Sequence, residues 1–143
     1  MFVNVILPLY LTREYSYSVP EAMQPAIAVG MRVLVSFGKQ KIYAGIVSKM
    51  HNDAPANYEA KPILELTDDT TVVNKYQLHH WKWIAEYYLC TLGEVMSAAL
   101  PSSLKIESES TLSLHPDAEL DAHRLNDKEH LLIETLQKKS RLP

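Results

Sequence analysis

Short apolar runs, alternating or continuous, dominate the first fifty residues and predict β-strands. Residues 2–7, FVNVIL, combine alternation with a continuous apolar run, as a strand covered on both faces does. Residues 15–19, YSYSV, alternate strictly, which places Tyr15 and Tyr17 on one face of a strand and Ser16 on the other. The N-terminal third of the chain is therefore expected to form a sheet.

A hairpin is the clearest local prediction. Residues 32–37, RVLVSF, and residues 40–49, QKIYAGIVSK, are apolar runs joined by Gly38 and Lys39. A two-residue loop with glycine first suits a type II′ turn, whose first position has a positive φ that glycine adopts without steric cost. The turn alone thus accounts for Gly38, whether or not a ligand binds there.

A long polar loop, a short strand and two helices follow the hairpin. The loop spans residues 51–62, and loops of this length are often functional. Residues 62–66 form a strand, a helix covers Asn74 to Leu89, and a second covers Glu94 to Leu100 before Pro101. The first helix has an apolar stripe expected to pack on the sheet: Leu78, Trp81, Ile84, Ala85 and Tyr88.

The pattern changes after Pro101. Residues 105–143 contain a polar linker, a possible strand over 111–114 and a helix from Asn126 to about Lys139. One strand and one helix bury too little apolar surface to form a core. We therefore expect one domain over residues 1–104, an incomplete second unit over 105–143, and a chain that is a fragment of a longer protein.

Charge is distributed unevenly along the 143 residues, whose net charge is -3. Residues 1–50 carry five basic and two acidic residues, whereas residues 51–106 carry four and seven, and residues 107–143 five and eight. The basic first third can attract a polyanion, although a solvated charged surface explains the same bias. The sequence shows no membrane-spanning run and no signal peptide, so we expect a cytoplasmic protein with no membrane partner.

No motif for catalysis or metal binding is present in the sequence. Phosphate-binding, dinucleotide, zinc-protease, hydrolase and EF-hand patterns are all missing. His79 and His80 face different sides of a helix, and the single cysteine, Cys90, is expected to be a small buried apolar residue. Trp81 and Trp83 are attributed to packing and partly exposed surface. We predict a binding module without enzymatic activity or cofactor.

Several short motifs, in order over about 100 residues, resemble the start of the PriA family of bacterial replication restart helicases, also called primosomal protein N-prime. The motifs are VILPL at 5–9, YSYSVP at 15–20, GMRV at 30–33, VSFGKQ at 35–40, GIV at 45–47, AEYY at 85–88, GEV at 93–95 and ALP at 99–101. The resemblance implies a 3′-DNA-binding domain, followed here by the start of a winged-helix domain. Combined with the pattern above, it predicts an α+β fold: a bent antiparallel, partly barrel-like sheet with two C-terminal helices.

The resemblance also implies a function and a site. This domain in the family binds the 3′-OH end of the nascent leading strand at stalled replication forks and positions a 3′-to-5′ helicase for restart. The family pocket corresponds to Tyr15, Ser16, Gly38 and Lys61 here, and Lys39 and Lys41 are expected to support the approaching strand. Tyrosine preserves the aromatic surface of the family, whereas Ser16 stands where many members have a carboxylate. Weaker discrimination between 3′-OH and 3′-phosphate ends is therefore predicted.

Other properties would belong to the full-length helicase. The resemblance implies that ATP, magnesium and zinc are bound only by its motor and cysteine-rich regions, and that its partners include primosome proteins and single-stranded-DNA-binding protein. Two alternatives remain open from the residues alone. Tyr15 and Tyr17 can be core residues and Lys61 a solvated lysine, or the domain can dock another primosome component rather than DNA.

Overall fold

The computed structural model describes residues 1–39 and 41–105, together with Ile133 and Thr135. The chain divides into two units, residues 1–108 and 109–143, and the first is described below. The predicted strand over 111–114 lies outside the described residues. Of the predicted helix over 126–139, only Ile133 and Thr135 are described, and both are helical.

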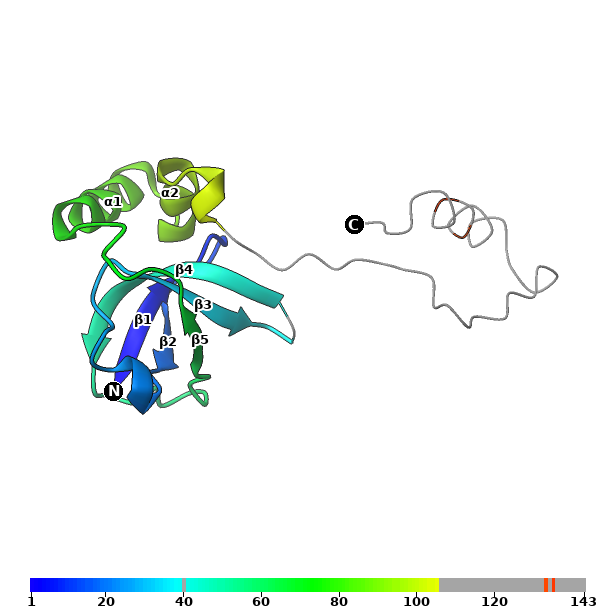
Figure 1. Ribbon diagram of the computed structural model, residues 1–143. Helices are drawn as coiled ribbons and strands as arrows, with labels where there is room; N and C mark the ends of the chain where they lie inside the picture. Colours follow the sequence, from blue (N-terminus) through cyan, green and yellow to red (C-terminus); the bar gives the residue numbers. More distant parts are fainter. Residues whose placement is uncertain (40, 106–132, 134, 136–143) are drawn as a thin grey trace. The chain divides into compact units, whose positions relative to one another are not determined.

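Five antiparallel strands form one curled sheet, as the predicted α+β fold requires (Figure 1). In spatial order they are β2 (Tyr15–Ser18), β1 (Phe2–Ile6), β4 (Lys41–His51), β3 (Arg32–Phe37) and β5 (Ile63–Leu66). The two edges approach each other, because Ser18 forms a bridge with Pro62 and its N–H donates to the Lys61 carbonyl oxygen at 2.9 Å. This contact curls the sheet into a half-barrel, and the loop before β5 lies beside β2.

The β3–β4 hairpin is present, but its turn differs from the prediction. Phe37 pairs with Lys41, so three residues rather than two connect the strands, and β4 begins one residue later than predicted and continues to His51. Gly38 has a φ of +68°, the left-handed conformation that glycine adopts most easily. The reason for glycine is therefore as predicted, whereas the two-residue type II′ loop is wrong.

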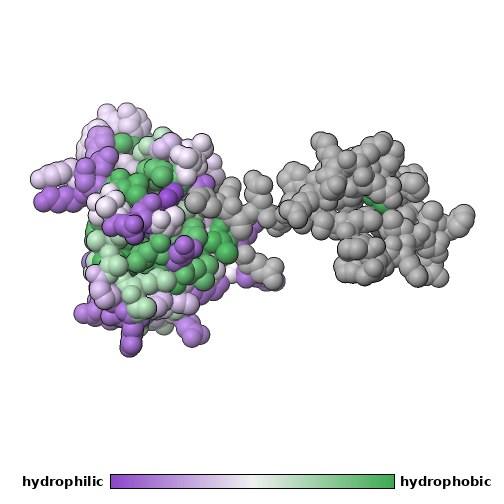
Figure 2. Space-filling view, in the orientation of Figure 1, coloured by the Kyte–Doolittle hydropathy of each residue, from purple (hydrophilic) through white to green (hydrophobic). Residues whose placement is uncertain are grey.

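Two apolar clusters hold the domain together. The first fills the concave side of the sheet and includes Val3, Val5, Tyr17, Val33, Val35 and Val47. The second lies between the outer face of the sheet and the helices α1 (Lys75–Tyr88) and α2 (Leu92–Ala99), and includes Ile6, Ile46, Leu78, Trp81, Val95 and Met96. Short 3₁₀ turns occur at Glu21–Met23 and Ser102–Leu104. On the face seen in Figure 2, apolar residues gather over the middle of the domain and polar residues toward its margins.

Capping groups set the starts of both helices. Asn74 and Thr91 each form a capping box with the residue three positions later, Gln77 and Glu94 respectively. Because Thr91 caps it, α2 begins at Leu92, two residues before the predicted start.

The predicted apolar stripe of α1 is confirmed except at its C-terminal end. Leu78 and Trp81 are buried, and Ile84 and Ala85 pack against them. Tyr88 is 67% exposed, because the helix ends there at a left-handed Leu89 and its ring packs only edge-on against the equally exposed Tyr87 among the described residues. Trp83 is half-exposed, and Cys90 is partly buried beside the second cluster, close to what the sequence predicts.

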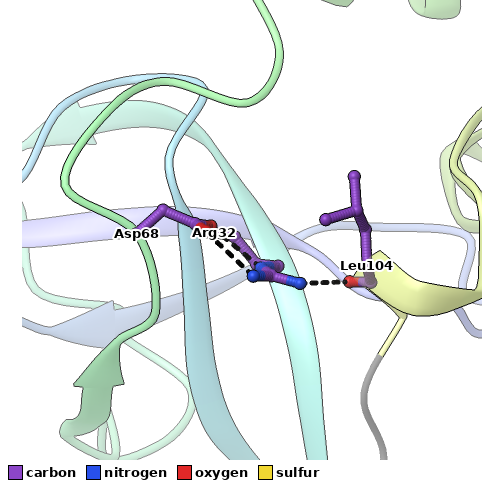
Figure 3. Close-up of polar contacts among 3 residues, drawn as sticks. All are labelled: Arg32, Asp68 and Leu104. Carbon is purple, nitrogen blue, oxygen red and sulfur yellow. Dashed lines mark hydrogen bonds and ion pairs between the residues drawn. The ribbon is translucent and has the colours of Figure 1, made fainter.

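The buried Arg32 side chain connects three parts of the domain through an ion pair and a hydrogen bond (Figure 3). Arg32 of β3 donates from Nε and Nη2 to the two carboxylate oxygens of Asp68, at 2.9 and 2.8 Å, and from Nη1 to the Leu104 carbonyl oxygen at 3.2 Å. The Arg32 residue is only 7% exposed. One of the five basic residues of the N-terminal third is therefore neutralised inside the fold.

Candidate functional site

Tyr15 lies at the start of β2 in a group of aromatic rings. Its ring packs edge-on against Phe37 with 5.1 Å between centroids, and it is tilted against Tyr58 at 5.8 Å. The Arg13 guanidinium carbon lies 5.1 Å from the centroid of the same ring. Tyr15 is partly buried and packs against the first core cluster, to which Tyr17, only 3% exposed, belongs.

Lys61 and Gly38 meet beside this aromatic group. The Lys61 Nζ donates to the Gly38 carbonyl oxygen at 2.7 Å. Phe37 precedes Gly38 and contacts Tyr15, so these residues, which are distant in sequence, lie together where the sheet edges approach. A Cβ added at Gly38 would meet nothing within 4 Å, so the backbone of the turn is open. The structure thus brings together three of the four predicted site residues.

The Ser16 side chain points elsewhere. Its hydroxyl donates to Asn4 Oδ1 at 2.8 Å and lies 3.3 Å from His51 Nε2. Strand alternation, visible in the sequence, predicts this opposite face. The Ser16 backbone N–H, by contrast, lies on the open edge of β2 and donates to the Tyr58 hydroxyl at 2.7 Å.

Tyr58 is the site residue that sequence reasoning missed. It lies in the loop between β4 and β5, where it contacts the Tyr15 ring and the Ser16 backbone. The only signal in the sequence is an aromatic residue in a loop that is long enough to suggest function. Lys39 lies within the hairpin turn, next to Gly38, and Lys41 is the first residue of β4; both side chains are exposed.

Two pKa shifts describe the electrostatics of this region. The pKa of Tyr17 is raised to about 12, mainly by burial and to a smaller extent by the charges of the neighbouring Tyr58 and Tyr15 side chains. A hydrogen bond with the Tyr15 side chain raises the pKa of Arg13, which stays cationic. The cations Arg13, Lys39, Lys41 and Lys61 are all exposed, so they can meet an anionic ligand without a large desolvation cost.

Neither metal binding nor membrane spanning is indicated among the residues that the structure describes. No cluster of three or more His, Cys, Asp or Glu side chains there can hold a metal ion. None of the helices there is long and apolar enough to cross a bilayer.

Comparisons with known proteins place the chain in a family. The family model of the 3′ DNA-binding domain (3′BD) of PriA matches residues 4–101. The chain is 35% identical over 104 residues to the replication restart protein PriA of Haemophilus influenzae, which covers 72% of this chain and 14% of that protein. It is 27% identical over 117 residues to PriA of Treponema pallidum, covering 78% of this chain and 17% of that protein. It is 26% identical over 110 residues to PriA of Bacillus subtilis, covering 77% of this chain and 14% of that protein.

The fold and the match together define a binding domain, and the family is that of the PriA 3′ DNA-binding domain, to which this chain belongs. The predicted resemblance is confirmed. The match to a binding domain also agrees with the prediction of a module without enzymatic activity. The chain spans only 14–17% of the length of the three relatives described above.

Proposed function

We propose that Tyr15, Gly38 and Lys61 bind the 3′-terminal nucleotide of a DNA strand. The observation that supports this most strongly is the Lys61 Nζ bond to the Gly38 carbonyl oxygen, at 2.7 Å, beside the Tyr15 ring. An aromatic surface, an open backbone turn and an ammonium group thus lie within one small region. The family match gives the same ligand class.

Each group has a chemical role in this proposal. The Tyr15 ring stacks on the terminal base whatever its identity, which is worth about 1–3 kcal/mol per base. Lys61 has three N–H donors, so it keeps its bond to Gly38 while another donor reaches a phosphate or a base edge. The absence of a Cβ at Gly38 lets the nucleotide approach the backbone closely.

Ser16 and Tyr58 would discriminate the strand end less strongly than a carboxylate does. A carboxylate would accept a bond from the 3′-hydroxyl and repel a 3′-phosphate, whereas the Ser16 hydroxyl is held by Asn4 on the other face. The Tyr58 oxygen accepts the Ser16 N–H, which leaves its own O–H free to donate to the 3′-oxygen. We expect a preference for 3′-OH over 3′-phosphate that stays below about a hundredfold, because that ratio corresponds to nearly 3 kcal/mol.

In a longer PriA-type protein, this domain would hold the end of the nascent leading strand at a stalled fork in the cytoplasm. It would thereby position the helicase for replication restart together with primosome proteins and single-stranded-DNA-binding protein. Lys39 and Lys41 would contact the approaching strand, and ATP, magnesium and zinc would bind only in the motor and cysteine-rich regions of such a protein.

Fluorescence anisotropy with 5′-labelled single strands ending in 3′-OH or 3′-phosphate tests the proposal. Tyr15→Ala should weaken binding of the 3′-OH strand by about 5- to 150-fold, which is the stacking energy expressed as affinity. Lys61→Ala should weaken binding and lower the dependence of log K on log salt concentration by about 0.7. Lys75→Ala, at an exposed lysine of α1, is the control. Equal affinity for both ends would refute the proposal, and insensitivity to salt and to Lys61→Ala would favour a protein-docking role.

A further inference from the structure

A second feature adjoins the candidate site. A cleft of about 690 Å³ lies between the connection from β1 to β2 on one side and helices α1 and α2 on the other. Its volume falls in the range of roughly 300–1,000 Å³ that is typical of sites for small ligands. A short stretch of single strand fits such a space, whereas a duplex does not.

The cleft meets the candidate site at Arg13. Arg13 lines the cleft, and its guanidinium lies over the Tyr15 ring at 5.1 Å. Asn4 also lines the cleft, but its side chain accepts the hydrogen bond of the Ser16 hydroxyl on the face of β2 opposite the Tyr15 ring. A strand whose last nucleotide is at Tyr15 would therefore enter the cleft past Arg13.

The charges around the cleft suit an anionic strand. Arg13, Lys49 and Lys82 line it and are exposed, and they come from three different elements. The two carboxylates that line it are Glu14 and Glu86, and Glu14 accepts a hydrogen bond from the Ser48 hydroxyl. Three cations face two carboxylates, one of which is engaged, so the cleft has an excess of positive charge.

Apolar side chains provide the remaining surface. Leu9, Leu11 and Leu92 line the cleft, and Leu89 at its edge is 92% exposed. Leucine side chains next to exposed cations can contact the faces of bases while the phosphates meet the cations. A purely acidic peptide would leave this apolar lining uncovered.

We propose that this cleft binds the nucleotides that precede the 3′-terminal one, and that Arg13 contacts the phosphate joining the two sites. The proposal rests on the proposed function of Tyr15, Gly38 and Lys61. A guanidinium can stack on an aromatic ring and still present N–H donors from its edge, so Arg13 can serve both neighbours. Lys49 and Lys82 then contact the next phosphates.

A length series of 5′-labelled oligonucleotides ending in 3′-OH tests the cleft separately from the end site. The dinucleotide reports on the end site, and strands of four and six nucleotides also reach the cleft. We expect the full chain to bind the longer strands more tightly, and the Lys49→Gln/Lys82→Gln variant to lose this gain but keep its affinity for the dinucleotide. Lys82→Gln should lower the salt dependence for the hexanucleotide by about 0.7, whereas Lys75→Gln on the same helix should leave it unchanged.

The outcomes separate the two proposals. A gain with length that persists in the Lys49→Gln/Lys82→Gln variant, or equal effects of Lys82→Gln and Lys75→Gln, overturns the cleft while the end site stands. No gain with length in the unmodified chain also overturns it, because the cleft then adds nothing to the affinity for the strand. Loss of the preference for a 3′-OH dinucleotide over its 3′-phosphate form refutes the proposed function instead.

Discussion

Replacing Asp68 by alanine should destabilise the domain strongly, because it leaves a buried guanidinium without its counter-ion. Arg32 is 7% exposed and gives Asp68 two hydrogen bonds, at 2.9 and 2.8 Å. Breaking a fully buried ion pair on one side costs about 3–5 kcal/mol. The Asp68 side chain is 23% exposed, so water can partly replace it. We therefore expect Asp68→Ala to cost about 2–4 kcal/mol.

The partner substitution should cost less. Arg32→Met keeps an unbranched apolar side chain in the same place and removes the buried charge. The substitution also removes the hydrogen bond that Arg32 donates to the Leu104 carbonyl oxygen at 3.2 Å. The loss of this donor should lower the free energy of unfolding by about 1–3 kcal/mol. Asp68 is closer to the surface and is more easily hydrated. The Arg32→Met/Asp68→Ala variant should thus be more stable than Asp68→Ala alone.

Urea denaturation of the three variants, followed by tryptophan fluorescence, measures these differences. Trp81 is 5% exposed in the second core cluster, so its emission reports unfolding. The free energies of unfolding should follow the order wild type, Arg32→Met, Asp68→Ala. A loss below about 1 kcal/mol for Asp68→Ala would show instead that solvent screens the pair as it does at a surface. A double variant less stable than Asp68→Ala would likewise contradict the expected cost of the unpaired guanidinium.

Alkaline pH should destabilise the domain through Tyr17, because burial raises its pKa from 10.0 to about 12 in the folded state. The stabilising effect of the neutral Tyr17 is complete below pH 10 and is lost as pH rises through 12. Thermal unfolding between pH 9 and 12 should show Tyr17→Phe losing about 2 kcal/mol less than the wild type, and parallel curves would exclude this role. Gly38→Ala should cost roughly 1–2 kcal/mol, because only its φ of +68° is unfavourable to alanine. Gly30→Ala should cost clearly more, because φ is +89° and the new Cβ would overlap the Val73 carbonyl oxygen; chemical denaturation giving equal losses for both would contradict this account.

Local patterns predicted most elements of the fold, because alternation and capping groups act over a few residues. Strict alternation at 15–18 gives β2 and places Ser16 opposite Tyr15, as the structure shows. The α1 helix follows from its apolar stripe, although Asn74, predicted as its first residue, is its N-cap. Tyr88 fits the same periodicity but is exposed, because periodicity does not show where the covering element ends.

Features that depend on contacts distant in sequence could not be predicted from local pattern. The meeting of the sheet edges relies on Ser18 and Lys61, and nothing near either residue indicates the other. Arg32 was counted with the surface cations, although its partner Asp68 lies 36 residues further along. The turn at Gly38 was predicted one residue too short, since the pairing of Phe37 with Lys41 determines the loop length.

The candidate site, too, could be predicted only in part from local sequence pattern. Composition and spacing alone left Tyr15 as a possible core residue and Lys61 as a possible solvated lysine. Only the family resemblance named them together with Gly38, and the fold brings the three into one region. Tyr58 was not predicted because the loop that carries it has no periodicity to interpret.

Backbone amide shifts measured by NMR, with a 3′-OH trinucleotide added to the labelled chain, would locate the bound nucleotide residue by residue. We expect the largest changes at Tyr15, Ser16, Gly38 and Lys61, and weaker changes there when the same trinucleotide carries a 3′-phosphate. Largest changes on other surfaces of the domain, with these four amides unaffected, would contradict the proposed site.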